Sequence, residues 1–484
     1  MKSSIKYTWI LFLLIVSPDP CHAQELYTVE RSAFSTREYY EYAPIPYQGN
    51  IVFTAEKRIK FGKISTGERN QFAANLFIVR PLGEDEWSEP MIFANELTDV
   101  NINHGWATFN ARGNRMFFTR NYDAGSKNAM ANAGIYYSGY AGGQWTGVQP
   151  FQHNDPAVNL IHPSLSEDGN MLFFSSDMPG GEGGFDIYVC TMERNAWGDP
   201  VNLGPAVNTR RHQIYPVYHE NGRLYFSSND HPGQGGYDIY YTENVDGEWI
   251  TPVNMPAPLN TRRNEGYFVA LDSAHTQGYL TSNRERARTN SIYEFNLDVP
   301  AFDSCNLQEE NNYCFTFYEA GTMDMDTTNF KYEWLIEDNR FRQESVDYCF
   351  RGIGDYIIQL NVIDMISGEV MFNEATYELN IVNIEQVYIS SPDTIYVNET
   401  IALDGNRTSL DNFQIDRFYW DMGDLTWVSD STVTHAWHKP GNYKVRLGVT
   451  SIANTAEEVQ KACSFKEIAV IPREGSITTV RQEN

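Results

Sequence analysis

The chain has 484 residues, a formal net charge of −27 and an aromatic content of 14%. Its length is enough for two or three domains. A surface this acidic argues against nucleic acid and anionic lipid headgroups as partners, because both carry negative charge. Beyond the N-terminus, no run approaches the roughly 18 apolar residues of a membrane helix, so no transmembrane segment is expected.

Residues 1–23 have the features of a signal peptide. Two lysines precede an apolar run, and Cys21-His22-Ala23 is an acceptable cleavage site. We therefore expect an exported protein whose mature chain begins at Gln24. The alternative is a lipoprotein anchored through Cys21, but Pro18-Asp19-Pro20 lacks the small apolar residues that such a site requires.

One sequence segment occurs twice in the middle of the chain. Residues 170–188 read NMLFFSSDMPGGEGGFDIY, and NGRLYFSSNDHPGQGGYDIY ends at Tyr240, 52 residues after Tyr188. Both apolar runs are short, aromatic and β-branched, which favours strands. The glycines between them can supply the positive φ angles of a tight connection. The unit is therefore predicted to be a β-hairpin.

The hairpin recurs, so that residues 24–298 contain five related repeats. Its Ile-Tyr element returns with conserved spacing, at Ile135, Ile187, Ile239 and Ile292, with a weaker Leu76-Phe77 before them. A shorter segment precedes each hairpin, which gives four strands per repeat, the content of a propeller blade. Residues 26–30 can supply the outer strand that the last repeat lacks. The sequence thus predicts a five-bladed β-propeller closed by the N-terminus.

Two further kinds of residue repeat within this unit. A single tryptophan follows most copies, at Trp87, Trp145, Trp197 and Trp249. We expect it to pack between neighbouring sheets, and the alternative is an exposed aromatic ring used for binding. Asp186 and Asp238 follow glycines at matched positions. They are expected to cap their hairpins through backbone N–H groups, with calcium binding as the alternative.

The pattern changes after residue 300. Residues 419–424 read YWDMGD, and His435-Ala436-Trp437 and Pro440-Gly441-Asn442-Tyr443 follow. Over residues 384–473 the chain resembles a PKD domain, an immunoglobulin-like β-sandwich, and the resemblance implies that Trp420 is the core aromatic. Residues 301–383 look like a degenerate copy, and residues 474–484 form a tail. The predicted fold is all-β: a five-bladed β-propeller followed by two immunoglobulin-like (PKD-type) β-sandwiches.

The mature chain has an odd number of cysteines, so at least one is unpaired or intermolecular: Cys190, Cys305, Cys314, Cys349 and Cys463. An exported chain can hold disulfides, and the three cysteines between residues 305 and 349 predict one bridge there. The PKD resemblance implies that the strand beginning at Cys314 neighbours the strand carrying Cys349. Cys314–Cys349 is therefore the favoured bridge, with Cys305–Cys314 as the alternative.

Residues 34–296 resemble the WD40-like, TolB-type repeats of cell-envelope proteins. The likeness is greatest to Bacteroidetes proteins in which a Ser-Ser-Asp…Gly-Gly-Phe-Asp-Ile-Tyr repeat precedes an OmpA-type peptidoglycan-binding domain, one group of which belongs to the type IX secretion and gliding machinery. We expect no OmpA-type domain here, so the peptidoglycan role is not carried over. The resemblance implies a periplasmic or outer-membrane-associated protein whose partners are envelope proteins.

The chain offers few groups for catalysis or metal binding. Five-bladed propellers can be glycosidases, which need carboxylates from several inner strands. Glu41 and Glu265 precede equivalent strands, but the other repeats place His104, Asn159 and Gln213 nearby, and solvated loop residues are the better interpretation. Asp421 and Asp424 are expected to serve a turn rather than calcium.

No Ser–His–Asp arrangement or metal-ligand spacing is present. The sequence therefore predicts no catalytic residue, no metal and no cofactor. It favours a non-enzymatic envelope scaffold, and the resemblance of the repeats implies an accessory of type IX secretion or gliding machinery. The alternative is a glycan-binding or glycan-cleaving propeller protein.

Overall fold

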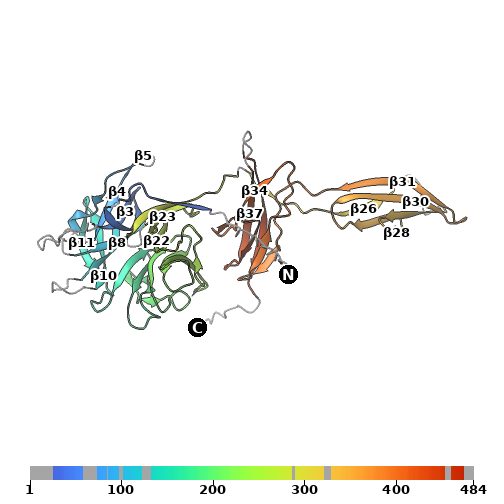
Figure 1. Ribbon diagram of the computed structural model, residues 1–484. Coiled ribbons are helices and arrows are strands. Elements are labelled where there is room, and N and C mark those ends of the chain that lie inside the picture. Colours follow the sequence, from blue (N-terminus) through green and yellow to red (C-terminus); the bar gives the residue numbers. More distant parts are fainter. Residues whose placement is uncertain are drawn as a thin grey trace, which may run out of the picture. The chain divides into compact units, whose positions relative to one another are not determined.

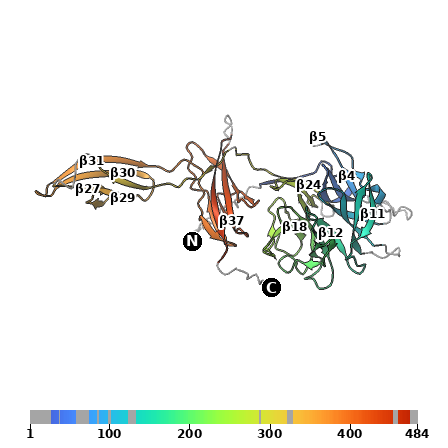
Figure 2. The same ribbon diagram turned by 180° about the vertical axis from the view of Figure 1, so that it is seen from behind.

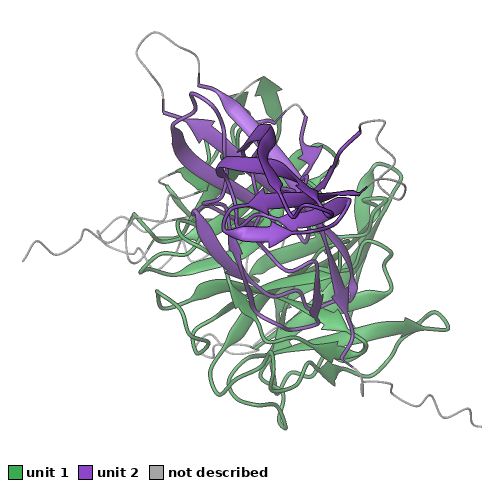
Figure 3. Cartoon of the chain, turned by 90° about the vertical axis from the view of Figure 1, so that its right-hand side faces the viewer, with its two compact units in different colours: residues 1–300 green, residues 301–484 purple. Residues whose placement is uncertain are grey.

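The computed structural model describes residues 26–36, 38–57, 74–83, 86–97, 102–122, 132–285, 289–302, 304–320, 329–452 and 459–473. The predicted signal peptide and C-terminal tail lie outside them. The chain forms two compact units, residues 1–300 and 301–484 (Figure 3). Apart from a 3₁₀ turn at Asn95–Leu97, the regular structure of the described residues is β-strand (Figures 1 and 2). Within these ranges, no helix is long and apolar enough to cross a membrane.

The first unit contains five antiparallel sheets, each built mostly from consecutive strands. The first sheet is β2 (Tyr39–Tyr47), β3 (Asn50–Lys57), β4 (Asn75–Val79) and β7 (Met91–Ile92), and the second is β8 (His104–Phe109), β9 (Arg115–Asn121), β10 (Ala133–Ala141) and β11 (Gln144–Pro150). A short hairpin, β5 (Pro81–Gly83) and β6 (Glu86–Trp87), follows β4.

The third and fourth sheets have the same layout, and in both the third strand pairs with two short outer strands. They are β12 (Leu160–Leu165), β13 (Met171–Ser176), β14 (Asp186–Glu193), β15 (Ala196–Trp197) and β16 (Val201–Asn202), then β17 (Gln213–Tyr218), β18 (Arg223–Ser228), β19 (Asp238–Val245), β20 (Glu248–Trp249) and β21 (Val253–Asn254). The fifth sheet is β22 (Glu265–Ala270), β23 (Gln277–Ser282), β24 (Ser291–Leu297) and β1 (Tyr27–Arg31).

The fifth sheet takes its outer strand from the start of the described chain. β1 pairs antiparallel with β24, with Tyr27 opposite Leu297 and Arg31 opposite Tyr293. The segment expected from the sequence therefore completes this sheet. The first strands of the sheets lie side by side in the order β2, β8, β12, β17 and β22, and β22 also lies beside β2.

Each first strand contains a residue in the left-handed region, which is costly for residues other than glycine. These residues are Ala43, Trp106, His162, Tyr215 and Tyr267, with φ between 45° and 58°. The pairing register shifts at each of them, so the same β-bulge is built five times. No local pattern in the sequence predicts this bulge.

Hydrogen bonds between neighbouring sheets hold several of these bulges. The backbone N–H of Trp106 donates to Thr54 Oγ1 (2.8 Å), that of His162 to Thr119 Oγ1 (3.0 Å), and that of Ala43 to Thr281 Oγ1 (3.1 Å). In each case the threonine belongs to the second strand of the neighbouring sheet. Because Thr281 lies in the fifth sheet and Ala43 in the first, the same bond joins the last sheet to the first.

The side chains at these bulges form a continuous aromatic cluster. The ring of His162 lies 4.7 Å from that of Trp106 and 4.2 Å from that of Tyr215, and Tyr215 is 6.2 Å from Tyr267. Burial lowers the pKa of His162 to about 3, so this imidazole is neutral at physiological pH. The cluster packs the region where the first strands meet.

The second unit contains two sandwiches. One has the sheet β25 (Asn306–Leu307), β38 (Lys461–Ile471), β37 (Gly441–Ser451), β34 (Ile415–Asp421) and β35 (Trp427–Val428), with β32 (Thr394–Tyr396) also pairing with β38. Its other sheet is β33 (Ile401–Asp404) and β36 (Thr432–His435). Trp420 and Trp437 are fully buried in its core.

The other sandwich has the sheet β28 (Asn339–Phe341), β27 (Phe330–Ile336), β30 (Gly354–Asp364) and β31 (Val370–Ile381), facing β26 (Cys314–Tyr318) and β29 (Ser345–Cys349). Residues 302–308 were assigned to it from the sequence, but they run along the PKD-like sandwich. There β25 pairs parallel with β38, and the ring of Phe302 lies 6.1 Å from that of Tyr419. The sandwich is thus an insertion between β25 and β32.

Two disulfides lie in the second unit. Cys314 and Cys349 stand opposite each other on β26 and β29 and are bonded. Cys305 is bonded to Cys463 of β38, so the alternative Cys305–Cys314 bridge does not form. Cys190 of β14 is free and buried.

Candidate functional site

Glu41 and Glu265, the carboxylates considered for glycoside cleavage, are buried in strands. Their exposed fractions are 0% and 2%, so the expectation of solvated loop residues is wrong. Glu265 accepts hydrogen bonds from Thr261 N (3.0 Å), Thr261 Oγ1 (2.7 Å) and Ser282 Oγ (2.8 Å). Glu41 accepts from Thr36 N (2.8 Å), Thr36 Oγ1 (2.9 Å) and Ser35 Oγ, and burial raises its pKa.

Gln213 holds the same repeat position and shows what the carboxylates do. Its Oε1 accepts a hydrogen bond from Thr209 N (2.9 Å), and its Nε2 donates to Thr209 Oγ1 (2.6 Å). In each case the side chain ties the preceding loop to the first strand of its sheet. The threonine four residues before Gln213 and Glu265 was the sequence signal for this role.

Asp186 and Asp238 hold the glycine-rich turns. Asp186 accepts from Glu182 N (2.5 Å), and Asp238 accepts from Gln234 N (2.7 Å) and Gly235 N (3.0 Å). In the described ranges, no group of three or more His, Cys, Asp or Glu side chains is arranged for a metal ion.

The glycines of these turns serve close packing more than positive φ. In the first turn only Gly180 has a positive φ (94°). At Gly183 a Cβ atom would lie 2.3 Å from the backbone carbonyl carbon of Arg210, which belongs to the loop before the next sheet. The expected positive φ is therefore found at Gly180, whereas Gly183 is required by the close approach of the neighbouring loop.

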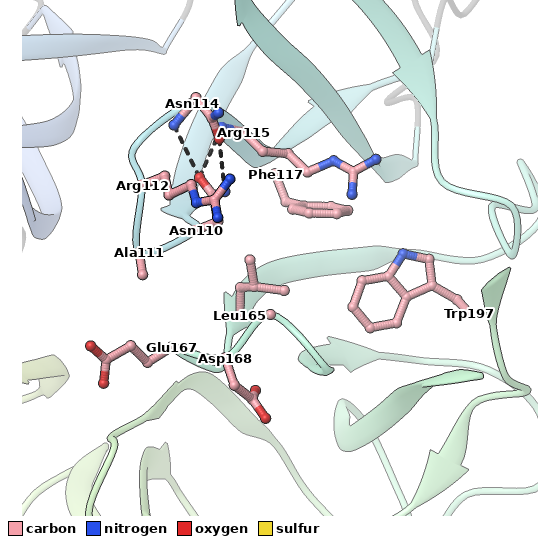
Figure 4. Close-up of a pocket in the computed structure, with 11 residues that line it drawn as sticks. Asn110, Ala111, Arg112, Asn114, Arg115, Phe117, Leu165, Glu167, Asp168 and Trp197 are labelled. Carbon is pink, nitrogen blue, oxygen red and sulfur yellow. Dashed lines mark hydrogen bonds between the residues drawn. The ribbon is translucent and has the colours of Figure 1, made fainter. Parts of the chain in front are cut away.

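A groove with a volume of about 370 Å³ lies between the second and third sheets of the first unit (Figure 4). Its walls are the β8–β9 turn on one side and the β12–β13 turn on the other, with a tryptophan from β15. We call it the Trp197 groove, and its lining side chains are Asn110, Ala111, Arg112, Asn114, Arg115, Phe117, Leu165, Glu167, Asp168 and Trp197, with Gly169.

Both turns are braced by their own side chains. Asn110 Oδ1 accepts from Asn114 N (3.0 Å) and Arg115 N (2.9 Å), and Asn110 Nδ2 donates to Asn114 Oδ1 (2.8 Å) (Figure 4). Asp168 Oδ1 accepts from Ser166 Oγ (2.5 Å) and Asn170 N (3.0 Å). Such bonds fix a turn before any ligand arrives, which lowers the entropic cost of binding.

Aromatic rings form the inner end of the groove. Phe117 is 1% exposed, and Trp197 is half-buried and meets it edge-on at 5.9 Å. Trp197 also lies 6.2 Å from Phe151, so part of its ring packs on the second sheet while it also lines the groove. Trp145 and Trp249 likewise pack on the sheet before their own, against Phe93 and Phe173.

The groove places opposite charges on its two walls. Arg115 lies over the rings of Phe117 (5.8 Å) and Tyr137 (5.4 Å), and neither it nor Arg112 forms an ion pair with any described residue. The hydrogen bond from Ser166 lowers the pKa of Asp168. A hydrogen bond with the Glu220 carboxyl raises the pKa of Glu167.

Comparison with known proteins identifies part of the chain. Residues 385–464 match the PKD domain family, so this part of the second unit is a PKD domain. Over 86 residues the chain is 31% identical to collagenase ColA of Clostridium perfringens (strain 13 / Type A). That match covers 17% of this chain and 8% of the length of the collagenase.

Solved structures match over longer stretches at low identity. An exo-β-1,3-galactanase from Clostridium thermocellum, 1,3Gal43A, is 12% identical over 90% of this chain and 96% of its own, with a TM-score of 0.34. The β-xylosidase RS223 is 12% identical over 55% and 94%, with a TM-score of 0.36. A prolyl endopeptidase is 10% identical over 87% and 56%, with a TM-score of 0.27.

These matches correct one prediction from the sequence. The chain was expected not to be an enzyme, but the solved structures that it matches are glycoside hydrolases and peptidases, so that expectation is contradicted. At these TM-scores the likeness names no reaction and no catalytic residue.

Proposed function

We propose that the protein binds a glycan in the Trp197 groove. The observation that carries the proposal is the combination of an aromatic end, Trp197 and Phe117, with directional polar side chains on both walls. A sugar ring presents an apolar C–H face and a rim of hydroxyl groups. Aromatic rings can cover such a face, and fixed amide, carboxylate and guanidinium groups can bond the hydroxyls.

Cleavage of the bound glycan is the second form of this proposal. Glu167 and Asp168 are two carboxyl groups in the lining of the groove, and glycoside cleavage uses a pair of carboxyl groups. We expect Glu167→Gln and Asp168→Asn to abolish any hydrolysis that the parent shows on a bound oligosaccharide. Unchanged hydrolysis in both variants would remove this form of the proposal.

A glycan array followed by titration calorimetry tests binding. We expect the parent to bind a subset of glycans, and Asn114→Ala and Trp197→Phe to weaken that binding. Thermal unfolding of each variant shows whether a loss comes from misfolding. The proposal fails if no glycan binds above background, or if both variants bind as the parent does.

We infer further that the five sheets of the first unit are the blades of a closed propeller. Support comes from the hydrogen bond between Ala43 and Thr281 and from the N-terminal strand in the fifth sheet. Closure would remove the open sheet edges that promote aggregation. It would also fix the distance between the two walls of the groove.

We propose that the protein is exported and lies in the periplasm or at the outer membrane. The predicted signal peptide and the two disulfides support this location, because disulfides persist in oxidising compartments. Envelope proteins, including type IX secretion components, are proposed partners from the resemblance of the repeats. Exposed apolar side chains on the inserted sandwich, such as Ile357 (58%) and Phe372 (66%), favour a protein contact.

Crosslinking in the native host tests the proposed partners. We expect an envelope protein to be captured by the parent and to be lost with the double variant Ile357→Ser, Phe372→Ser. Capture that is the same for both proteins would place the contact elsewhere.

A further inference from the structure

The charge on one wall of the Trp197 groove points to the class of glycan. Resting on the proposed glycan binding, we infer that the ligand is an acidic saccharide whose single carboxylate is bound by Arg115. A comparison between two sheets of the same unit carries this inference.

Arg115 and Arg223 occupy the same position in their repeats. Each is the first residue of its sheet's second strand, β9 or β18, and each lies over a tyrosine of the third strand. The guanidinium carbon of Arg115 is 5.4 Å from the ring centre of Tyr137, and that of Arg223 is 4.1 Å from Tyr241. The tyrosine therefore holds the arginine in both sheets.

The residue opposite the arginine differs between the two sheets. Arg223 stands opposite Glu243, and its Nε lies 2.8 Å from Glu243 Oε1. Arg115 stands opposite Gly139, which has no side chain. A Cβ atom built at Gly139 would meet nothing within 4 Å, so the space beside Arg115 is open. The fourth sheet thus supplies an internal carboxylate where the second sheet leaves room for an external one.

The two arginines also differ in burial. The Arg223 side chain is 5% exposed and its charge is neutralised internally, whereas Arg115 is exposed at the groove. The whole chain has 63 acidic against 36 basic residues. In a protein with so many carboxylates, two groove arginines without an ion pair among the described residues form a localised anion-binding surface.

Guanidinium chemistry and the opposite wall define the ligand further. The planar fork of arginine matches the two oxygens of a carboxylate. Asp168, whose pKa is lowered, presents a negative charge on the other wall and would repel a second anionic group. An otherwise neutral saccharide with one acidic residue, such as a uronic acid, would pair its carboxylate with Arg115 and place no second negative charge near Asp168.

Titration calorimetry with matched saccharides tests this inference. The probes are a uronate-containing oligosaccharide, the same oligosaccharide with its carboxyl group reduced to the alcohol, and a sulfated analogue. We expect the parent to bind the uronate at least tenfold more tightly than the reduced form, and more tightly than the sulfated one. Binding of the uronate should weaken as salt is added.

Three variants assign the effect to Arg115. Arg115→Met introduces the residue that β13 has at this position, and Gly139→Glu recreates the pair of Arg223 and Glu243. Both should remove the preference, so that the uronate and its reduced form bind each variant with equal affinity. Gly139→Gln is the uncharged control of equal size and should keep the preference. Thermal unfolding confirms that each variant is folded.

Each outcome bears on a different claim. Equal affinity of the parent for the uronate and its reduced form would overturn the acidic-saccharide inference while leaving glycan binding intact. Tighter binding of the sulfated analogue would overturn the assignment to a carboxylate. A preference that survives both Arg115→Met and Gly139→Glu would overturn the role of Arg115. Binding of none of the three saccharides would count against the proposed function itself.

Discussion

Trp197 and Trp249 pack in nearly the same way, yet their surroundings differ. Trp197 meets Phe117 edge-on at 5.9 Å, and Trp249 meets Phe173 edge-on at 6.0 Å. Beside Trp197 the neighbouring side chains are Arg115 and Leu165, which line the groove. The residues at the same positions beside Trp249 are Met171 and Tyr218, which pack into an apolar cluster with it.

The difference shows which parts of a repeat hold the fold and which serve the proposed site. The tryptophan repeats because it packs each sheet on the one before it. Tyr218 stacks on Phe173 at 4.8 Å, where the smaller Leu165 leaves space. A functional site in a repeated fold is therefore best sought where one copy departs from the others.

The largest effect is expected from a deletion that destabilises the whole first unit, including the surroundings of both tryptophans. Deleting residues 24–31 takes β1 from the fifth sheet and exposes the edge of β24. We expect the first unit to melt at a clearly lower temperature, while the PKD domain is unaffected. Calorimetry of the parent and the truncated chain measures this. An unchanged melting temperature would show that closure through β1 is wrong and would require a sixth blade or an open arrangement.

Truncating either tryptophan tests the packing role that Trp197 and Trp249 share. Trp197→Ala and Trp249→Ala should each lower the free energy of unfolding of the first unit by about 3 kcal/mol, the usual cost of removing a large packed aromatic ring. Urea denaturation gives both values. If only Trp249→Ala is destabilising, Trp197 has no packing role and belongs to the binding surface alone.

Exchanging the residues beside Trp249 tests whether the surroundings of the tryptophan define the binding site. The double variant Met171→Arg, Tyr218→Leu gives the Trp249 site the side chains found beside Trp197. We expect it to gain weak binding of the same saccharide, seen as a second site in calorimetry. No change in stoichiometry would mean that the turns, rather than these two positions, define the groove.

The smallest expected effect concerns the turn that carries Asp168. Asn221 occupies the equivalent position in the next sheet, where its Oδ1 accepts from Arg223 N at 2.9 Å. Because the pKa of Asp168 is lowered in the fold, its ionised form adds stability above the unfolded value of about 3.9. That stability is lost as the pH falls through the lower folded value.

Asp168→Asn keeps the turn and removes the titration. The parent should be slightly more stable than this variant at pH 6, and the difference should vanish as the pH approaches 2. Urea midpoints across this range measure it. A difference that grows on acidification would contradict the sign of the pKa shift.

Much of the fold could be predicted because it depends on sequence repeats and on local motifs. The Ile-Tyr strands recur at nearly fixed spacing, and the motif around Trp420 is typical of a PKD domain. The bulges at His162 and its equivalents could not be predicted, since they depend on contacts between sheets. The bridge from Cys305 to Cys463 spans 158 residues and has no local signal.

The candidate site was harder to predict for a physical reason. Trp197 is evident in the sequence as a repeated residue, but its repetition indicates a packing role. Arg115 matters because Gly139 stands opposite it, and that pairing is defined only by the strand register. Burial of Glu41 and Glu265 likewise depends on threonines brought close by the loops before each sheet.

The most direct test of the central claim is the saccharide affinity of two matched variants. Trp197→Phe and Trp249→Phe both keep an aromatic ring for packing between sheets. For the strongest ligand found on the array, we expect Trp197→Phe to weaken binding about tenfold, equivalent to about 1.4 kcal/mol, and Trp249→Phe to bind as the parent does. Equal affinities for both variants, or a greater loss for Trp249→Phe, would contradict the assignment of the binding site to the Trp197 groove.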